Sequence, residues 1–315
     1  MSAPGARLAA GGPAPVTATD RLGLLLLASI TLFWGVNWPA MKMAVAEVPV
    51  WTFRTICLLV GGLGLLAICR AAGLSLRIPR RQLGPLLGVS LLNITGWHVF
   101  SAYGVLHMEA GRASIVAFTM PLWAALLSVP ILGERLGWSI VAGLAMGMAG
   151  LAVLVLPEWH SVVAAPLGLV FMLLAAMSWA AGTVLLKRWR WEMPVSVLAG
   201  WQLLLGGLPV IAGALFLDRG FDPLGVSWQG WTATLYAALI PMIYCHWAWF
   251  RVVTIYPASI AAIGTLAIPV LGVLSSAMML PEPIGPDIVL SLVLVLGSLG
   301  LVLFVPSLRL RRRQR

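Results

Sequence analysis

Two histidines are the residues in this sequence whose type and position best suit proton chemistry in an apolar environment. His98 and His246 each lie inside a long apolar segment, and imidazole changes its charge near neutral pH. All ten acidic residues fall at the ends of such segments or between them, whereas proton-coupled carriers commonly use a buried carboxylate. The histidines are therefore the candidates for proton coupling, with a plain hydrogen-bonding role in helix packing as the alternative.

Three charged residues are candidates for gating. Arg54 falls about one turn inside the apolar segment 50–69, and a charge within a membrane-spanning segment is a functional hypothesis by default. The alternative is a structural anchor, since a long side chain near a segment end can extend to the interface. Glu134 and Glu282 close corresponding segments in the two halves of the chain, and simple helix capping is the alternative for both.

Aromatic and amide side chains form stripes at helical spacing. Trp34, Asn37 and Trp38 share one face of a predicted helix, and a second helix carries Asn93 and Trp97 in the same way. Amide, phenol and indole groups suit a small amphipathic ligand better than an inorganic ion, which requires several oxygen ligands or charge. Packing within a helix bundle is the alternative for the indoles. The predicted substrate pathway comprises Trp34, Asn37, Trp38, Asn93, Trp97, His98, Trp179, Tyr244 and His246.

Neither a metal site nor a cofactor is predicted. The cysteines Cys57, Cys69 and Cys245 lie in or near apolar segments without metal-ligand spacing, where a free cysteine packs as a small hydrophobe. The pattern Gly-x(4)-Gly-Lys-Ser/Thr, which binds nucleotide phosphates, is absent from the sequence. The sequence therefore does not indicate direct use of ATP.

The composition indicates that membrane helices position these side chains. Of 315 residues, 61% are hydrophobic and 10% are charged, against about 45–50% and 25% in soluble domains. The net charge of +10 does not predict nucleic-acid binding, because the basic residues fall in short gaps between apolar segments. Segments long enough to cross a bilayer occupy residues 22–43, 50–69, 83–105, 113–132, 137–156, 166–186, 195–217, 229–251, 258–280 and 287–305.

We therefore expect an all-α integral membrane protein with ten transmembrane helices. Most Lys and Arg residues fall on one side of this arrangement, which indicates the cytoplasmic side. Both termini are then cytoplasmic, with residues 1–21 as a disordered tail and residues 306–315 as a basic tail. The expected location is a bacterial-type plasma (inner) membrane. The expected partners are the lipid bilayer and a small-molecule substrate. A homodimer is possible, and the sequence does not decide it.

The two halves of the sequence repeat each other. Sliding the chain so that His98 falls on His246 also puts Pro121 on Pro269 and Glu134 on Glu282. We expect one five-helix repeat over residues 22–156 and a second over residues 166–305. Because five spans are an odd number, the second repeat must be inverted relative to the first. Inverted repeats are typical of secondary transporters, in which the binding site lies near the membrane midplane and access alternates between the two sides.

Two short motifs resemble those of the drug/metabolite transporter superfamily, and specifically of its EamA-type members. The first is Phe33-Trp34-Gly35-x-Asn37. The second follows a proline and reads Leu132-Gly133-Glu134-Arg135 in the first half and Leu280-Pro281-Glu282-Pro283 in the second, with Pro281 where the family usually has Gly. The resemblance implies a basket of ten helices with a central cavity, lined mainly by helices one, three, four, six, eight and nine. It also implies export of small metabolites or amino acids.

The predicted function is that of a secondary transporter, not an enzyme. The expected cargo is a small metabolite such as an amino acid or an amphipathic compound, and export is implied by the resemblance alone. One alternative is a membrane receptor or an assembly scaffold without transport. The other is an intramembrane serine hydrolase that would use Ser90 together with His98 or His246.

Overall fold

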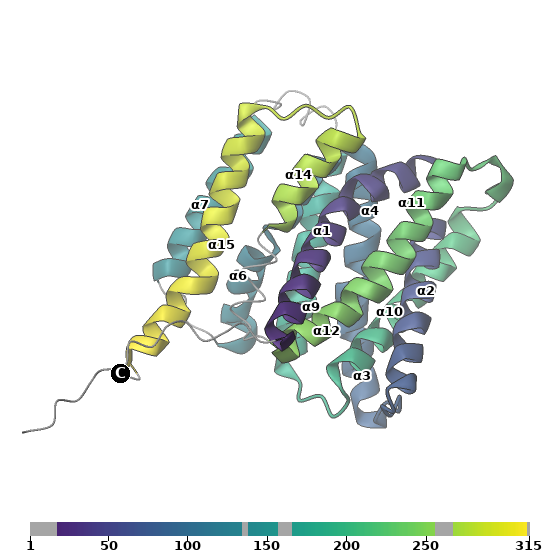
Figure 1. Cartoon of the computed structure of the whole chain (residues 1–315), viewed down its shortest axis with the longest axis horizontal. Coiled ribbons are helices and arrows are strands. Elements are labelled where there is room, and N and C mark those ends of the chain that lie inside the picture. The colour runs from purple at the N-terminus through teal and green to yellow at the C-terminus, as the bar shows by residue number, and fades with distance from the viewer. Residues whose placement is uncertain (1–17, 134–137, 157–165, 256–266, 314–315) are drawn as a thin grey trace, which may run out of the picture.

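The computed structural model describes residues 18–133, 138–156, 166–255 and 267–313, and all the regular secondary structure in these ranges is helical. The α-helices, in chain order, are α1 (Ala18–Glu47), α2 (Val50–Ala71), α3 (Leu83–Ser90), α4 (Trp97–His107), α5 (Ala110–Ala117), α6 (Met120–Leu132), α7 (Trp138–Val155), α9 (Leu167–Arg188), α10 (Val195–Leu217), α11 (Trp228–Leu239), α12 (His246–Ile255), α14 (Ile268–Met279) and α15 (Pro286–Arg313). They form a bundle of roughly aligned helices (Figure 1).

Six stretches of the described chain are long and apolar enough to cross a membrane, which agrees with six of the expected segments. They are Arg21–Glu47, Val50–Ala71, Arg80–His107, Ala110–Leu132, Leu167–Arg188 and Val195–Leu217. Shorter apolar helices occupy Val141–Gly150, Ile268–Met279 and Pro286–Ser298. The expected segment 258–280 begins in residues outside the described ranges.

Two expected helices are interrupted by π-helical turns. Residues Leu91–Gly96 separate α3 from α4, and residues Ile240–Cys245 separate α11 from α12. The second turn contains Pro241, which has no N–H to donate to the preceding helical turn. π-turns inside helices release backbone groups and concentrate at functional sites.

The expected helix 113–132 is instead two helices, because Pro121 removes a backbone donor. A regular helix would bond the N–H of residue 121 to the carbonyl of Ala117, and α5 ends at Ala117. Pro121 then occupies the first turn of α6, where its missing N–H costs nothing. Pro269 takes the same place in the first turn of α14.

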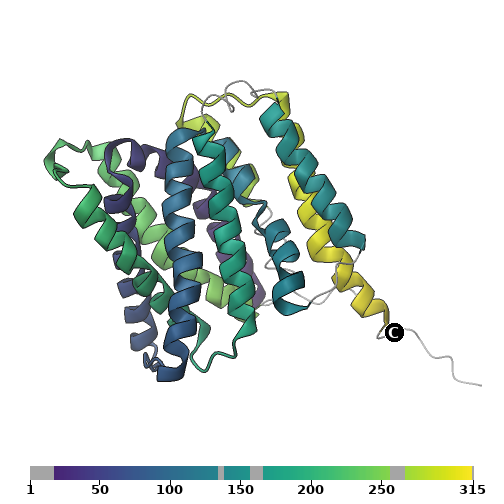
Figure 2. The same ribbon diagram turned by 180° about the vertical axis from the view of Figure 1, so that it is seen from behind.

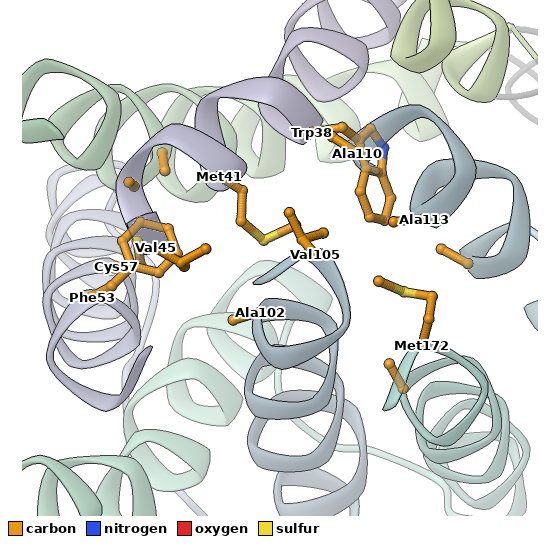
Figure 3. Close-up of a cluster of buried hydrophobic side chains, with 14 of the residues drawn as sticks. Trp38, Met41, Val45, Phe53, Cys57, Ala102, Val105, Ala110, Ala113 and Met172 are labelled. Carbon is orange, nitrogen blue, oxygen red and sulfur yellow. The ribbon is translucent and has the colours of Figure 1, made fainter. Parts of the chain in front are cut away.

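The core lies where α1 meets α2, α4 and α5, and where α9 packs against α4 and α5. Figure 3 shows the side chains that gather there, and all of them are almost completely buried: Trp38, Met41, Val45, Phe53, Cys57, Ala102, Val105, Ala110, Ala113 and Met172. α1 runs through the middle of the bundle and also packs against α11, α12 and α14. Residues on α1 are therefore in reach of both halves of the chain.

Large apolar side chains also cover the outside of the bundle. Leu25, Leu215 and Phe216 are 68%, 68% and 66% exposed. A soluble protein rarely exposes so many large apolar side chains, but lipid tails solvate them well. At one edge α7 and α15 lie side by side in both views (Figures 1 and 2), and the Ser291 hydroxyl donates to the carbonyl of Gly150 at 2.7 Å.

The bundle has two ends, which we name after one charged residue each. The Glu282 end holds the end of α1 at Glu47 and the connections at residues 48–49, 108–109, 218–227 and 280–285. The Arg81 end holds the connections at residues 72–79 and 189–194. There Arg81 forms an ion pair with Glu192, and Gln82 donates to the carbonyl of Arg190 at 3.1 Å.

Close packing of α10 against the first π-turn depends on Gly206. A Cβ atom at this position would lie 2.7 Å from the Ser90 carbonyl oxygen and 2.5 Å from Ile94 Cβ. We expect Gly206→Val to lower the free energy of unfolding by about 1–3 kcal/mol, as overpacking does. The matched control is Gly88→Val, since a Cβ there meets nothing within 4 Å. Measuring the free energy of unfolding in detergent checks this prediction. An equal loss of stability in Gly206→Val and Gly88→Val would contradict the close contact at Gly206.

Candidate functional site

Polar and aromatic side chains line the faces of α1, α2, α4 and α12 that meet inside the bundle. We call five of them the polar seam: Trp34, Asn37, Arg54, His98 and His246. The Trp34 ring lies edge-on to the His246 ring, with 6.1 Å between their centroids. On α1, Asn37 lies one turn from Trp34 and one turn from Met41, and Met41 contacts Arg54. α1 thus connects the two ends of the seam.

The seam lies at the depth of the membrane interior. At 1.5 Å per helical residue, Met41 is about 9 Å and Trp34 about 20 Å from the end of α1 at Glu47. On α4, His98 is about 14 Å from the end of the helix at His107. A hydrocarbon core is about 30 Å thick, so these positions lie within it. Arg54 is about 6 Å from the start of α2 at Val50, and its side chain extends from there to the carbonyl of His98.

The two histidines differ in their hydrogen bonding. His98 is 4% exposed, and its Nδ1 has no hydrogen-bond partner among the described residues. In His246, Nδ1 lies 2.9 Å from the carbonyl oxygen of Pro241. Because a carbonyl only accepts, Nδ1 of His246 donates, and its Nε2 carries the lone pair when the ring is neutral. His98 lies within electrostatic range of both Arg54 and His246.

Arg54 is buried with 2% exposure, and its guanidinium extends to α4 rather than to the nearby interface. Nε donates to the His98 carbonyl at 2.8 Å, and Nη2 donates to the Ser101 hydroxyl at 2.9 Å and to the Met41 sulfur at 2.6 Å. The guanidinium also lies 4.9 Å from the centre of the Phe53 ring. All these partners are uncharged.

A second aromatic and amide cluster lies where the first π-turn meets α9 and α10. Trp97 and Trp179 are edge-on with centroids 6.4 Å apart, and Asn93 donates to Gln202 at 3.3 Å. The Ser178 hydroxyl donates to the carbonyl of Leu92 in the π-turn at 2.8 Å. The Asn93 amide oxygen is buried without a partner among the described residues.

The remaining residues of the predicted pathway have separate surroundings. The Tyr244 hydroxyl is 2.8 Å from the Ser29 hydroxyl, and its ring lies edge-on to Phe33. Trp38 is 5% exposed and belongs to the apolar core. The Asn37 amide oxygen is buried and has no hydrogen-bond partner among the described residues. The structure thus brings Asn37 and Trp34 to the polar seam and places Trp38 in the packing beside it.

Glu282 caps α5 across the boundary between the halves. Its two carboxylate oxygens accept from the backbone N–H groups of Ala110 at 2.8 Å and Gly111 at 3.0 Å. A helix N-terminus carries unpaired N–H donors and partial positive charge, so a carboxylate is the partner it favours. Glu134 lies outside the described residues.

Sequence reasoning missed the other polar contacts of the Glu282 end. Thr52 donates through its backbone N–H and its hydroxyl to Asp218, at 2.7 and 2.8 Å. Further contacts join Glu47 to Ser227, Lys42 to the carbonyl of Met108, and Arg112 to Glu109 and Asp287. The sequence locates these charges at segment ends, but it holds no signal for which ends meet.

The described residues hold no group of three or more His, Cys, Asp or Glu side chains that could bind a metal ion. The cysteines Cys57, Cys69 and Cys245 are free and buried. Ser90, the serine considered as a nucleophile, donates to the carbonyl of Leu86 in its own helix at 2.6 Å. Its proton therefore has a partner in the backbone.

The sequence is similar to curated transporters over most of its length. It is 31% identical to the "Uncharacterized transporter YvbV" of Bacillus subtilis, over 88% of this chain and 90% of that protein. It is 28% identical to a "Probable amino-acid metabolite efflux pump" of Salmonella typhimurium, over 91% and 95% of the two chains. A solved crystal structure shares the fold with a TM-score of 0.63 at 22% identity, over 93% of this chain and 99% of that one.

The family model described as "EamA-like transporter family" matches the chain twice, over residues 21–156 and residues 166–304. These two matches cover most of the sequence, including every residue of the polar seam. The resemblance expected from the motifs is thereby confirmed. The chain is a multi-pass membrane protein and belongs to the EamA-like transporter family.

Proposed function

We propose that the protein is a secondary transporter that exports small metabolites such as amino acids by alternating access between two inverted five-helix repeats. The observation that carries the proposal is the exchange symmetry of the helix contacts. By the sequence offset, α1 corresponds to α9, α4 to α12 and α6 to α14. The contact of α4 with α9 therefore corresponds to that of α12 with α1, and the contact of α6 with α9 to that of α14 with α1. The pairs α2–α10 and α7–α15 each join equivalent members of the two halves. Such a pattern is expected for two repeats related by a pseudo-two-fold axis.

The two π-turns support the same symmetry. Leu91–Gly96 precedes His98, and Ile240–Cys245 directly precedes His246. The same family model also matches each half separately. With α11 and α12 counted as one interrupted span, and residues 258–280 as another, this arrangement favours ten membrane helices over residues 22–156 and 166–305.

The contacts at the Glu282 end support alternating access. Glu282 with α5, Asp218 with Thr52, and Ser227 with Glu47 each connect one half of the chain to the other. We infer that these bonds hold the Glu282 end closed and break when that end opens. The contacts of Arg81 with Glu192 and of Gln82 with the Arg190 carbonyl join the halves at the opposite end and would break when that end opens. The basic residues of the sequence favour a cytoplasmic Arg81 end. The Glu282 end would then face outward, with both termini in the cytoplasm of a cell with a bacterial-type inner membrane.

The cargo is inferred from the seam and from the relatives. Indole, amide, imidazole and guanidinium groups inside the membrane-spanning bundle suit an amphipathic molecule with an apolar part and a polar part. Two relatives are named as amino-acid metabolite efflux pumps, which favours amino acids over inorganic ions. The direction of export rests on those names.

Counterflow in proteoliposomes tests this function. The purified protein is reconstituted, loaded with one unlabelled amino acid at a time, and supplied outside with the labelled form. We expect saturable uptake that requires internal amino acid. Ligand binding without flux would instead indicate a receptor, and covalent labelling of Ser90 by a fluorophosphonate would indicate a hydrolase.

The histidines of the seam are the proposed site of proton coupling. His98 and His246 come from different halves, lie within electrostatic range of each other, and are the titratable acid–base pair of the seam beside the permanently charged Arg54. We expect His98→Gln combined with His246→Gln to abolish a several-fold stimulation of counterflow by a pH gradient, because glutamine keeps the hydrogen bonding but does not titrate. Flux without a gradient should fall but stay measurable, because the glutamine oxygen at position 98 can still accept a hydrogen bond.

His107→Gln is the control for this pair, since His107 is an exposed histidine on the same helix as His98. It should leave the stimulation intact. Full stimulation in the double variant would show that the proton acts elsewhere.

A further inference from the structure

Arg54 is a buried cation whose charge no described acid neutralises. Removing a charged group from water is costly unless an opposite charge compensates it. Its acceptors are the His98 carbonyl, the Ser101 hydroxyl and the Met41 thioether, and the Cys57 thiol also lies within hydrogen-bonding reach. None of these partners is a carboxylate, so they satisfy N–H groups of the guanidinium without supplying a carboxylate counter-ion.

Every acidic side chain that the structure describes has its partner elsewhere. Those of the Glu282 end bond to α5, Thr52, Ser227 and Arg112, Asp222 caps its own turn, and Glu192 pairs with Arg81 at the opposite end. The acids outside the described side chains are Asp20, Glu134 and Glu158, which the sequence puts at the far ends of apolar segments or between them. Among the described side chains, no acid therefore acts as a counter-ion to Arg54.

Unpaired acceptors lie along the same seam. His98 Nδ1 and the Asn37 amide oxygen are both buried and lack hydrogen-bond donors among the described residues. Asn37 is one helical turn from Met41, which itself contacts Arg54. The seam thus combines an uncompensated cation with acceptors that lack donors. A zwitterion carries the complementary groups, because a carboxylate is an anionic acceptor and an ammonium is a donor.

We propose that Arg54 binds the carboxylate of the transported molecule and so makes the protein selective for carboxylate-bearing, zwitterionic substrates. The guanidinium is suited to this role because its planar fork of donors matches a carboxylate. The Asn37 oxygen and His98 Nδ1 then accept from the ammonium group. This inference rests on the proposed transport function and names the residue that selects its substrate.

The test compares ligands that differ only in the carboxylate. The full chain is placed in lipid nanodiscs, and binding of leucine, methionine and phenylalanine and of their carboxamides is measured by tryptophan fluorescence. In the wild type we expect at least one amino acid to bind about 10- to 100-fold more tightly than its amide, the range typical of a charged hydrogen bond. In Arg54→Gln this preference should vanish, while the affinity for the amide stays the same.

Further variants separate substrate binding from a structural role. Arg54→Lys keeps the charge and should retain part of the preference, and Ser101→Ala removes one tether of the guanidinium but should keep the preference. Arg70→Gln changes an exposed arginine of the same helix and should behave as the wild type. A structural role alone would weaken amino acid and amide equally in Arg54→Gln.

Binding and counterflow together distinguish a failure of the inference about Arg54 from a failure of the transport function. If the wild type binds each amino acid and its amide equally, or binds none of them, the inference about Arg54 is wrong. If it prefers the carboxylate through Arg54 but gives no counterflow, the inference holds and the transport function fails. If amides are carried as well as amino acids, transport holds and the inference fails.

Discussion

Joining positions 52 and 218 with a short thiol cross-linker is expected to abolish transport. Thr52 in the first half and Asp218 in the second share two hydrogen bonds at the Glu282 end. In a Thr52→Cys, Asp218→Cys variant, a cleavable bifunctional methanethiosulfonate would hold that end closed. Alternating access requires the end to open in every cycle. Counterflow should fall to the level of empty liposomes and recover when a reductant cleaves the linker.

The controls are Thr52→Cys alone and Asp218→Cys alone, each treated with the same reagent. The native cysteines are buried, and any effect of their modification appears equally in the controls. Transport that continues through a linked Glu282 end would contradict the proposed rocking of the halves. A loss of transport that a reductant does not reverse would indicate damage to the protein rather than a locked state.

The sequence predicted the membrane class, because this class depends on local patterns. Apolar length and short polar gaps are visible residue by residue. The repeat predicted from the sequence puts His98 and His246 at equivalent positions, and in the structure a π-turn precedes each of them. The interruption at Ala117 is also encoded locally in Pro121, but the apolar pattern of residues 113–132 by itself predicts one continuous helix. Hydropathy does not register the backbone donor that a proline removes.

The contacts between helices could not be predicted in the same way. Arg54 donates to the His98 carbonyl instead of extending to the interface because α2 packs beside α4. That Glu282 caps α5 depends on how the halves meet. The offset that puts His98 on His246 also puts Arg54 on Gln202, so the sequence shows that the charge is absent from the second half but not that it is buried without a counter-ion. Such facts belong to tertiary packing, on which a single sequence carries little information.

Removal of the Glu282 carboxylate is expected to open the Glu282 end. In Glu282→Ala, the N–H groups of Ala110 and Gly111 lose the two oxygens that accept from them. Hydrogen bonds to a charged group are worth about 1.5–3 kcal/mol. The balance between closed and open states should therefore shift by about 10- to 100-fold towards the open one. Transport should slow by a similar factor, because the return to the closed state becomes unfavourable.

The shift is measurable as thiol reactivity. A Met108→Cys reporter lies beside α5 at the Glu282 end, and a membrane-impermeant maleimide should label it faster in Glu282→Ala than in the parent. Glu282→Gln keeps one acceptor oxygen without the charge and should fall between the two. Asp222→Ala is the matched control, since Asp222 is an exposed acid that caps only its own turn. Equal labelling in Glu282→Ala and in the control would mean that Glu282 merely caps a helix. Faster labelling with slowed transport would identify the cap of α5 as the contact that closes this end of the protein.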